Sequence, residues 1–292
     1  MSLPTFTIVT PSFNQAAYLE QTIRSVLDQK YPNLQYIIID GGSSDGSVEI
    51  IKRYASHLDY WISEPDRGQS HALNKGFARA GGDILGFINS DDGFYPGALH
   101  TVAELYQQGS SWIVGHVDIL EQDGTRAPQV LHPLATPIDW FFTNPIPQQG
   151  TFWAAQYTKQ LGPFSEDLRY TFDYDFWMRL RFRANLMPHI LPSPLAWFRM
   201  HAASKTVAEG TSFTAENMQI RKRFISVFPR SQQRDVMRQV RRRISQWQQQ
   251  LGWAALKRGQ ARTARTHARV AIRQSPTDLQ SWRLLYCAMR GH

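Results

Sequence analysis

Cysteine is almost absent from this sequence, which has a single one, Cys287, among its 292 residues. One cysteine cannot form an intramolecular disulfide or a multi-cysteine zinc site, so the fold must be stable without covalent cross-links. The chain also lacks an uncharged apolar run of roughly 18 to 20 residues, the length that a membrane-spanning helix needs. Its start lacks the basic segment and apolar centre of a secretory signal. We therefore expect a cytoplasmic protein.

Acidic residues are scarce in the last quarter of the chain. Residues 216–292 contain 17 Lys and Arg against three Asp and Glu, a net charge of +14, whereas residues 1–215 contain 15 against 21, a net charge of −6. This asymmetry predicts two units with different roles, and the basic unit favours an anionic partner. With 42% hydrophobic residues the chain can still bury a full core, which excludes disorder as its dominant state.

Strand and helix patterns alternate along the first 90 residues. Apolar, β-branched runs predict buried strands at residues 5–10, 34–39, 60–63 and 84–88. Amphipathic segments predict helices between them, at about residues 16–28, 47–56 and 69–80. This alternation predicts an α/β fold with a mostly parallel, doubly wound sheet, in which ligands bind at the carboxyl ends of the strands.

The sequence from about residue 214 is helical and rich in Arg and Gln. We place a boundary within residues 203–215 and expect an α/β domain over residues 1–210 and a basic α-helical region over residues 211–292. A 34-residue frame starting at Ser245 places small residues where a tetratricopeptide helix pair favours them, although an unrelated basic hairpin fits equally well. A single repeat cannot bury its apolar face, so it must pack on the large domain or on another chain, which favours a homo-oligomer.

Carboxylates stand where several of the predicted strands end. An aspartate at the end of a buried strand is costly, so Asp40 and the pair Asp91 and Asp92 each need a ligand, a cation or a hydrogen-bond donor. Two adjacent carboxylates also suit a hard divalent cation. Taken singly, each has an alternative interpretation as a helix cap or a solvated turn residue. Their joint occurrence favours one binding crevice.

The sequence contains, in this order, the segments TIVTPSFN, IIIDGGSSDGS, EPDRGQSHALNKGFARAGGDILGFINSDD, FDYDFWMRL and RMHAASKT. From about residue 5 to residue 206 it thereby resembles the family 2 glycosyltransferases, nucleotide-sugar-dependent enzymes with the GT-A fold. The resemblance implies inverting transfer of a sugar from a nucleotide diphosphate sugar, with UDP favoured, to a hydroxyl acceptor. It further implies a bound divalent cation, Mn²⁺ or Mg²⁺, and a saccharide or lipid-linked saccharide acceptor in the synthesis of a bacterial surface polysaccharide or glycolipid.

The resemblance also implies roles for individual residues. It implies nucleotide binding by Pro11, Ser12, Asn14, Asp40, Arg67, Gly68, Asn74, Lys75 and Asp91. It implies a metal site formed by Asp91, Asp92 and His201. Acceptor contacts are expected at Gln148, Gln149 and Trp153. The sequence departs from the family pattern at two positions, since Asn89 replaces the first Asp of the D-x-D motif and Gly41 stands where a second Asp is common.

The catalytic base is expected in the segment FDYDFW at residues 172–177. Alignment of this segment on Trp177 and Arg179 places Asp173 in the position of the family's base, with Asp175 as the alternative. One carboxylate suffices for inversion, because it takes the proton of the acceptor hydroxyl in a single displacement. A retaining hydrolase would need a second carboxylate close by as nucleophile, which the sequence does not specify.

Other functions compete with this one. A catalytically silent nucleotide-sugar-binding scaffold would keep the strand-end carboxylates without needing Asp173, and Asn89 is its support. Nucleic-acid binding is not expected, because the basic region lacks closely spaced aromatic residues and any recognisable motif. We favour attraction of this region to an anionic membrane, which would hold the enzyme peripherally at the inner face of the cell membrane, with a solvated basic surface as the alternative.

Overall fold

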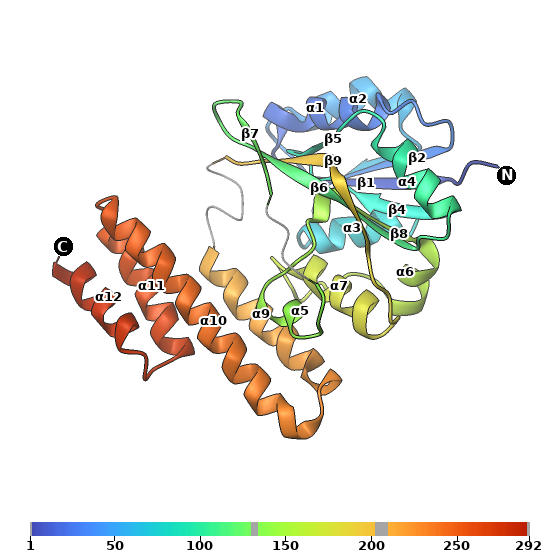
Figure 1. Cartoon of the computed structure of the whole chain (residues 1–292). Helices are drawn as coiled ribbons and strands as arrows, with labels where there is room; N and C mark the ends of the chain where they lie inside the picture. The colour runs from blue at the N-terminus through green and yellow to red at the C-terminus, as the bar shows by residue number, and fades with distance from the viewer. Residues whose placement is uncertain (1, 130–133, 202–209, 291–292) are drawn as a thin grey trace. The chain divides into compact units, whose positions relative to one another are not determined.

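The computed structural model describes residues 2–129, 134–201 and 210–290 (Figure 1). The chain divides into two compact units, the first formed by Met1–His132 with Pro145–Ile220 and the second by Pro133–Asn144 with Arg221–His292. The boundary expected within residues 203–215 falls largely outside the described residues. In the structure the division comes after Ile220, inside α9 (Gly210–Phe224).

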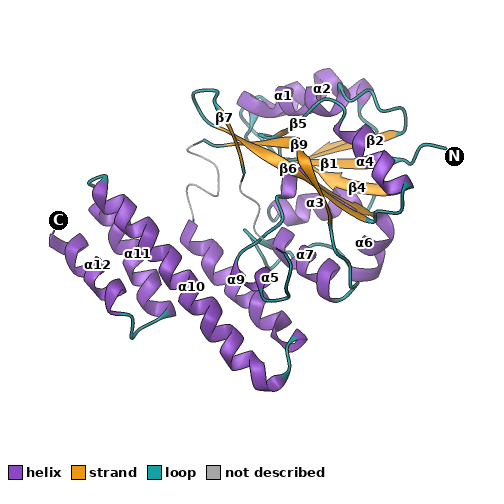
Figure 2. Ribbon diagram, viewed as in Figure 1, coloured by secondary structure: helices purple, strands orange, loops and turns teal. Residues whose placement is uncertain are grey.

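A sheet forms the centre of the first unit (Figure 2). Its parallel half has the order β3-β2-β1-β4, with bounds Tyr60–Ser63, Leu34–Asp40, Phe6–Ser12 and Ile84–Phe87. The sheet continues through β8, β6, β9 and β5, with bounds Thr151–Ala154, Trp112–Leu120, His189–Arg199 and Gly93–Phe94. The short β7 (Arg126–Pro128) pairs with β6. The predicted α/β fold with a doubly wound sheet is confirmed, although β5, β7, β8 and β9 are not indicated by the sequence pattern.

Helices cover both faces of this sheet. Apolar residues of α1 (Ala16–Leu27), α2 (Ser47–Tyr54) and α4 (Ala98–Gln107) share one core with Phe6 and Ile8 of β1. The 3₁₀ helix η1 (Ala55–His57) extends α2. Since Phe6 and Ile8 are two residues apart on a strand, they face the same side, as the alternation of a strand requires.

The helix α3 (Gln69–Phe77) packs on the opposite face of the sheet. A Cβ atom on Gly76 of α3 would lie 2.5 Å from Cγ1 of Val9, so glycine lets α3 approach β1. Next to it, α6 (Ala155–Leu161) and α7 (Phe172–Phe182) belong to the part of the unit that is rich in aromatic side chains. There Trp153 contacts Phe164 and Trp177 at centroid distances of 6.2 and 5.6 Å.

One carboxylate fixes the starts of two helices. Asp45 accepts hydrogen bonds from the backbone N–H of Ala16 (2.8 Å) at the start of α1 and of Ser47 (3.0 Å) at the start of α2. Such acceptors satisfy amide groups that a helix terminus leaves unpaired. Burial acts to raise the pKa of Asp45, but the hydrogen bonds from Ser47 and Ala16 outweigh it and lower the pKa below its ordinary value. Asp45 is therefore a capping residue.

The second unit is helical. It contains α10 (Arg230–Lys257), α11 (Ala261–Gln274) and α12 (Leu279–Arg290), with α5 (Asp139–Phe142) and η3 (Ile225–Val227) also packing on α10. Small residues allow close packing, since a Cβ atom on Gly252 would lie 2.4 Å from Cδ2 of Leu284. The comparison with a tetratricopeptide pair stays a prediction. No helix in the described ranges is long and apolar enough to cross a bilayer.

The helical unit should lose stability in mild acid because of His267. Burial lowers the pKa of His267 from its ordinary 6.5, and its Nδ1 lies 2.7 Å from Oε1 of Gln248. Above the pKa of the unfolded state, the ring is neutral in both states and its full contribution to stability is present. As the pH falls toward the lower pKa of the folded state, the unfolded chain binds the proton more readily, and this contribution is lost. Hydrogen-exchange protection factors of α11 amides should therefore decrease between about pH 7 and about pH 5. H267Q should lack this decrease, and an equal decrease in both proteins would contradict the assignment.

Candidate active site

The carboxyl ends of the parallel strands bring polar residues to one edge of the sheet. Ser12 of β1 is in register with Asp40 of β2, which is in register with Ser63 of β3. Pro11 is buried next to Ser12. The Ser12 Oγ is a buried hydroxyl that has no hydrogen-bond partner among the described residues. A buried unpaired hydroxyl is costly, so it indicates a place where a polar ligand is accepted.

Asp40 is fully buried and is surrounded by donors of its own chain. Its carboxylate accepts hydrogen bonds from the backbone N–H groups of Gly42 (3.1 Å) and Ser43 (2.8 Å) and from the hydroxyls of Ser43 (2.6 Å) and Ser63 (2.7 Å). These bonds offset the cost of burying the charge. They also fix the loop that follows β2, so Asp40 shapes the edge whether or not a ligand is bound.

A second carboxylate reaches this edge from the loop after β3. A Cβ atom on Gly41 would lie only 2.7 Å from Oδ2 of Asp66 and 3.2 Å from Cδ2 of Phe13, so a side chain at position 41 would collide with Asp66. The Asp66 Oδ1 accepts the N–H of Gly68 (2.7 Å). Phe13 is 60% exposed beside it and offers an aromatic face on which a base can stack, a residue that the motif comparison did not single out.

Three of the expected nucleotide-binding side chains hold parts of the protein together. Asn14 accepts the N–H of Ser44 (3.0 Å) and so links the loops after β1 and β2. Asn74 exchanges two hydrogen bonds of 2.9 Å with the backbone of Phe164, and Lys75 Nζ lies 2.7 Å from Oε1 of Glu64. The structure therefore gives Asn14, Asn74 and Lys75 supporting contacts.

Arg67 is the exposed cation among the expected nucleotide-binding residues. Its guanidinium pairs with Glu166, and its side chain keeps 69% of its surface exposed. The hydrogen bond from Asn74 lowers the pKa of Glu166, against the effect of burial, and Arg67 adds to the lowering. An exposed ion pair of this kind contributes little to stability, so Arg67 can exchange Glu166 for a phosphate.

Asp92 is a buried structural hub. Its Oδ1 accepts the backbone N–H of Arg199 (3.0 Å), and its Oδ2 accepts the amides of Gln149 (2.9 Å) and Asn89 (3.1 Å). Burial, with a further contribution from the charge of Asp91, raises its pKa well above the ordinary value for an aspartate. Both oxygens accept hydrogen bonds from the protein, so Asp92 holds this edge together, and its expected role as a metal ligand stays a prediction.

Asp91 and His201 meet at the same edge. The His201 Nε2 lies 2.9 Å from Oδ2 of Asp91, and the two side chains keep 8% and 15% of their surface exposed. The His201 ring packs against Tyr18, with ring centroids 4.8 Å apart. Arg199, whose Nε donates to the Asp91 carbonyl (3.2 Å), also lies over Tyr18. Two distant segments therefore hold this pair in place.

The pair fits a divalent cation in its chemistry. The described ranges contain no group of three or more His, Cys, Asp or Glu side chains that could enclose a metal ion. Carboxylate and imidazole are nevertheless suitable ligands for Mn²⁺, and Mg²⁺ is usually held by one or two carboxylates together with substrate phosphates and water. Asp91 and His201 would thus supply the protein ligands, and the diphosphate would supply others.

The two carboxylates of α7 lie in different surroundings. Asp175 is buried, and its Oδ2 lies 3.0 Å from Nε of Arg179. Arg179 in turn donates to the carbonyls of Leu161 (2.8 Å) and Pro163 (2.9 Å). Asp173 is partly exposed in the first turn of the helix. Asp173 is therefore the better placed of the two to reach a substrate.

The three residues expected to contact the acceptor are buried. Gln148 and Gln149 in η2 (Gln148–Gly150) are 8% and 9% exposed, and Gln148 donates to the Phe87 carbonyl (2.7 Å). Trp153 is 1% exposed, and its indole N–H donates to Thr158 (2.8 Å). These three residues support the site by packing and hydrogen bonding, and their expected contact with the acceptor stays a prediction.

A residue that sequence reasoning missed positions α7. Glu216 of α9 accepts the backbone N–H groups of Arg169 (2.9 Å), Tyr170 (2.9 Å) and Thr171 (3.0 Å), immediately before α7 begins. A carboxylate is favourable at a helix N-terminus, where unpaired amides and the helix dipole attract negative charge. Because its partners lie more than 40 residues away in the sequence, no local pattern indicates this role.

Removal of the Glu216 carboxylate should loosen the start of α7. We expect E216A to lower the free energy of unfolding by about 1–3 kcal/mol, because three backbone donors lose their acceptor. Chemical denaturation would measure this change. The control is Q219A on the exposed side of the same helix, which should stay within about 0.5 kcal/mol of wild type. Equal effects of the two substitutions would contradict the role of Glu216.

A doubly wound, mostly parallel sheet covered by helices on both faces is the fold of the GT-A glycosyltransferases. The model of the family described as Glycosyl transferase family 2 matches residues 7–183. The chain belongs to this family and is a glycosyltransferase.

Individual relatives agree with this assignment. An uncharacterised glycosyltransferase of Mycobacterium tuberculosis is 30% identical over 186 residues, which cover 61% of this chain and 69% of that protein. TuaG of Bacillus subtilis, a glycosyltransferase provisionally assigned to teichuronic acid biosynthesis, is 33% identical over 135 residues, or 44% of this chain and 53% of TuaG.

Two solved structures share the fold. S. aureus TarS in complex with UDP-GlcNAc has a TM-score of 0.68 at 15% identity, covering 99% of this chain and 92% of that one. The mannosyltransferase PcManGT from Pyrobaculum calidifontis, in complex with GDP-Man and Mn²⁺, has a TM-score of 0.62 at 16% identity, covering 99% and 81%. At these identities the similarity shows the fold alone.

Proposed function

We propose that this enzyme transfers a sugar, with inversion, from a nucleotide diphosphate sugar to a hydroxyl of a cell-envelope saccharide or lipid-linked saccharide. The observation that carries the proposal is the Asp91 and His201 pair at the carboxyl edge of the parallel strands, with 2.9 Å between Oδ2 and Nε2. The TarS complex with UDP-GlcNAc supports a UDP-sugar donor, and the assignment of TuaG supports an envelope acceptor. The basic residues 216–292 support action at a membrane surface.

Different described residues bind different parts of the donor. The ring of Phe13 stacks on the base, the Ser12 hydroxyl and the Asp40 loop border the nucleoside, and Arg67 binds a phosphate oxygen. Asp91 and His201 would hold a divalent cation, which when bound neutralises charge on the departing diphosphate.

Asp173 would act as the general base. Its carboxylate accepts the proton of the acceptor hydroxyl while the acceptor oxygen forms a bond to the anomeric carbon. The bond between that carbon and the diphosphate oxygen breaks, and its electron pair leaves with the nucleoside diphosphate. Because one displacement occurs, the anomeric configuration inverts. Asn89 donates hydrogen bonds to Asp92 and to Gln148 (3.1 Å each), so an asparagine at this position has a structural role. Its presence is therefore no argument for the catalytically silent scaffold.

The donor site can be tested by thermal unfolding with UDP, GDP and dTDP, each with and without Mn²⁺. A ligand that binds only the folded state at a hundredfold excess over its Kd stabilises by about 2.7 kcal/mol, which corresponds to roughly 5–10 °C in Tm. We expect one nucleotide to give such a shift in the presence of Mn²⁺. D91A should lose the metal-dependent part, whereas E121A, which removes an exposed carboxylate elsewhere, should keep it. Absence of a shift with every nucleotide would contradict the proposal.

Turnover distinguishes the two carboxylates of α7. With the donor identified, D173N should bind nucleotide as wild type does but lower kcat by about 10²–10⁴-fold. D175N should instead lower the free energy of unfolding by about 3–5 kcal/mol, because it removes the carboxylate of a buried ion pair with Arg179. Full turnover by D173N would exclude Asp173 as the base. Nucleotide binding by the wild type without any turnover would favour the scaffold alternative.

A further inference from the structure

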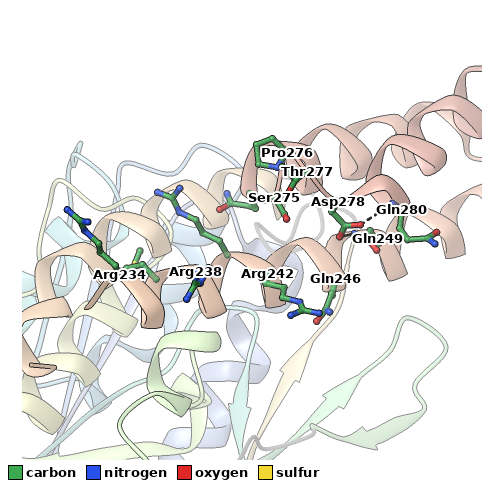
Figure 3. Close-up of a pocket in the computed structure, with 13 residues that line it drawn as sticks. Arg234, Arg238, Arg242, Gln246, Gln249, Ser275, Pro276, Thr277, Asp278 and Gln280 are labelled. Carbon is green, nitrogen blue, oxygen red and sulfur yellow. Dashed lines mark hydrogen bonds between the residues drawn. The ribbon is translucent and has the colours of Figure 1, made fainter. Parts of the chain in front are cut away.

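The second unit contains a basic groove between α10 and the turn that joins α11 to α12 (Figure 3). Its volume is 790 Å³, within the range of small-ligand sites. Four exposed arginines of α10 line it, Arg234, Arg238, Arg241 and Arg242. Their spacing of four, three and one residues places them along one side of the helix. Figure 3 shows Arg234, Arg238 and Arg242 spread along α10 beside the turn at residues 275–278.

The described residues balance only part of the charge of this groove. Arg238 pairs with Asp235, but Arg234, Arg241 and Arg242 make no ion pair with any residue that the structure describes. The acidic residue of the groove, Asp278, already accepts the amide of Gln249 (2.7 Å). Neighbouring guanidinium groups repel each other, and each has a planar donor set that matches phosphate oxygens. The groove therefore suits a phosphate-bearing anion.

An exposed apolar stripe on α12 adjoins the groove. Leu279, Trp282, Tyr286 and Met289 are 81, 49, 54 and 68% exposed. Their spacing of three, four and three residues places them on one face, while Ser281, Leu284 and Ala288 are buried on the other.

The stripe and the groove are continuous. The indole N–H of Trp282 donates to the carbonyl of Pro276 (2.8 Å), and Pro276 lines the groove. Leu279 stands between Asp278 and Gln280, which also line it. A cationic groove and an aromatic, apolar helix face therefore form one surface, which we call the α10–α12 face.

We propose that the α10–α12 face docks on an anionic phospholipid bilayer, with a lipid phosphate in the arginine groove and the α12 stripe among the headgroups and upper acyl chains. Trp and Tyr favour this depth in a bilayer, and basic side chains add attraction to anionic lipid. A second copy of the chain is a poorer occupant, because it would bring a second set of unbalanced arginines to the contact. The purpose of this docking, access to a lipid-linked acceptor, rests on the proposed function. The docking itself does not depend on it.

Sedimentation with vesicles tests the groove. The full chain should bind vesicles of phosphatidylcholine mixed with phosphatidylglycerol, and not vesicles of phosphatidylcholine alone. R234Q/R238Q/R242Q should weaken this binding on the order of 100-fold, since each basic residue near an anionic surface contributes about 1 kcal/mol. The matched control R258Q/R262Q/R269Q removes three exposed arginines outside the groove and should weaken binding much less. Equal losses in the two variants would overturn the proposal.

A second pair of variants tests the stripe. L279Q/M289Q changes two exposed residues, so the fold should persist, and should weaken vesicle binding by about tenfold or more. L3Q/M187Q, which changes two apolar residues of the first unit that are 43 and 52% exposed, should leave vesicle binding unchanged. If L279Q/M289Q instead lowers the mass measured by analytical ultracentrifugation and leaves vesicle binding intact, the face binds a second copy and the proposal fails.

The vesicle experiments and the nucleotide titration test the two proposals independently. Vesicle binding is measured without nucleotide, and the nucleotide-dependent rise in Tm is measured without lipid. R234Q/R238Q/R242Q should keep the nucleotide response of wild type. Failure of the vesicle experiment would leave the donor site unaffected, and failure of the nucleotide titration would leave the lipid contact unaffected.

Discussion

The buried carboxylate of Asp92 is the interaction on which the site depends. Burial makes its charge costly, as its raised pKa indicates, and the cost is offset only when donors from three segments surround it. These donors are Asn89 after β4, Gln149 in η2 and the backbone of Arg199 at the end of β9. Arg199 also contacts the Asp91 carbonyl, so the closure around Asp92 fixes its neighbour at the open edge.

The first half of the fold is predictable because its signals are local. Runs of apolar residues alternate with amphipathic segments, and the strand expected at residues 60–63 is β3 with the same bounds. By contrast, β9 contains Pro192 and Pro194, which a sequence pattern interprets as evidence against a strand. It becomes a strand by pairing with β6 across register shifts around His116. Such pairing depends on distant residues and leaves no local pattern.

For the site, too, local sequence signals indicate where a residue lies along the chain but not how its side chain is oriented. Motif order indicates Asp40, Asp91, His201 and Asp173 as site residues, and the structure brings Asp91 and His201 within 2.9 Å of each other. Motif order does not show which way an oxygen faces. Asp92 turns toward protein donors and Trp153 enters the aromatic core, since the hydrogen-bond partners and packing that decide these orientations come from other parts of the chain.

The contact between Gly41 and Asp66 constrains which residues can stand at either position. The family resemblance implies an acid at residue 41, where this chain has glycine. In space, the carboxylate of Asp66 lies 2.7 Å from where a side chain at position 41 would begin. A carboxylate from the loop after β3 therefore occupies the space beside position 41. The two positions are sterically coupled, since a side chain at position 41 requires the Asp66 carboxylate to move or to be replaced by a smaller group.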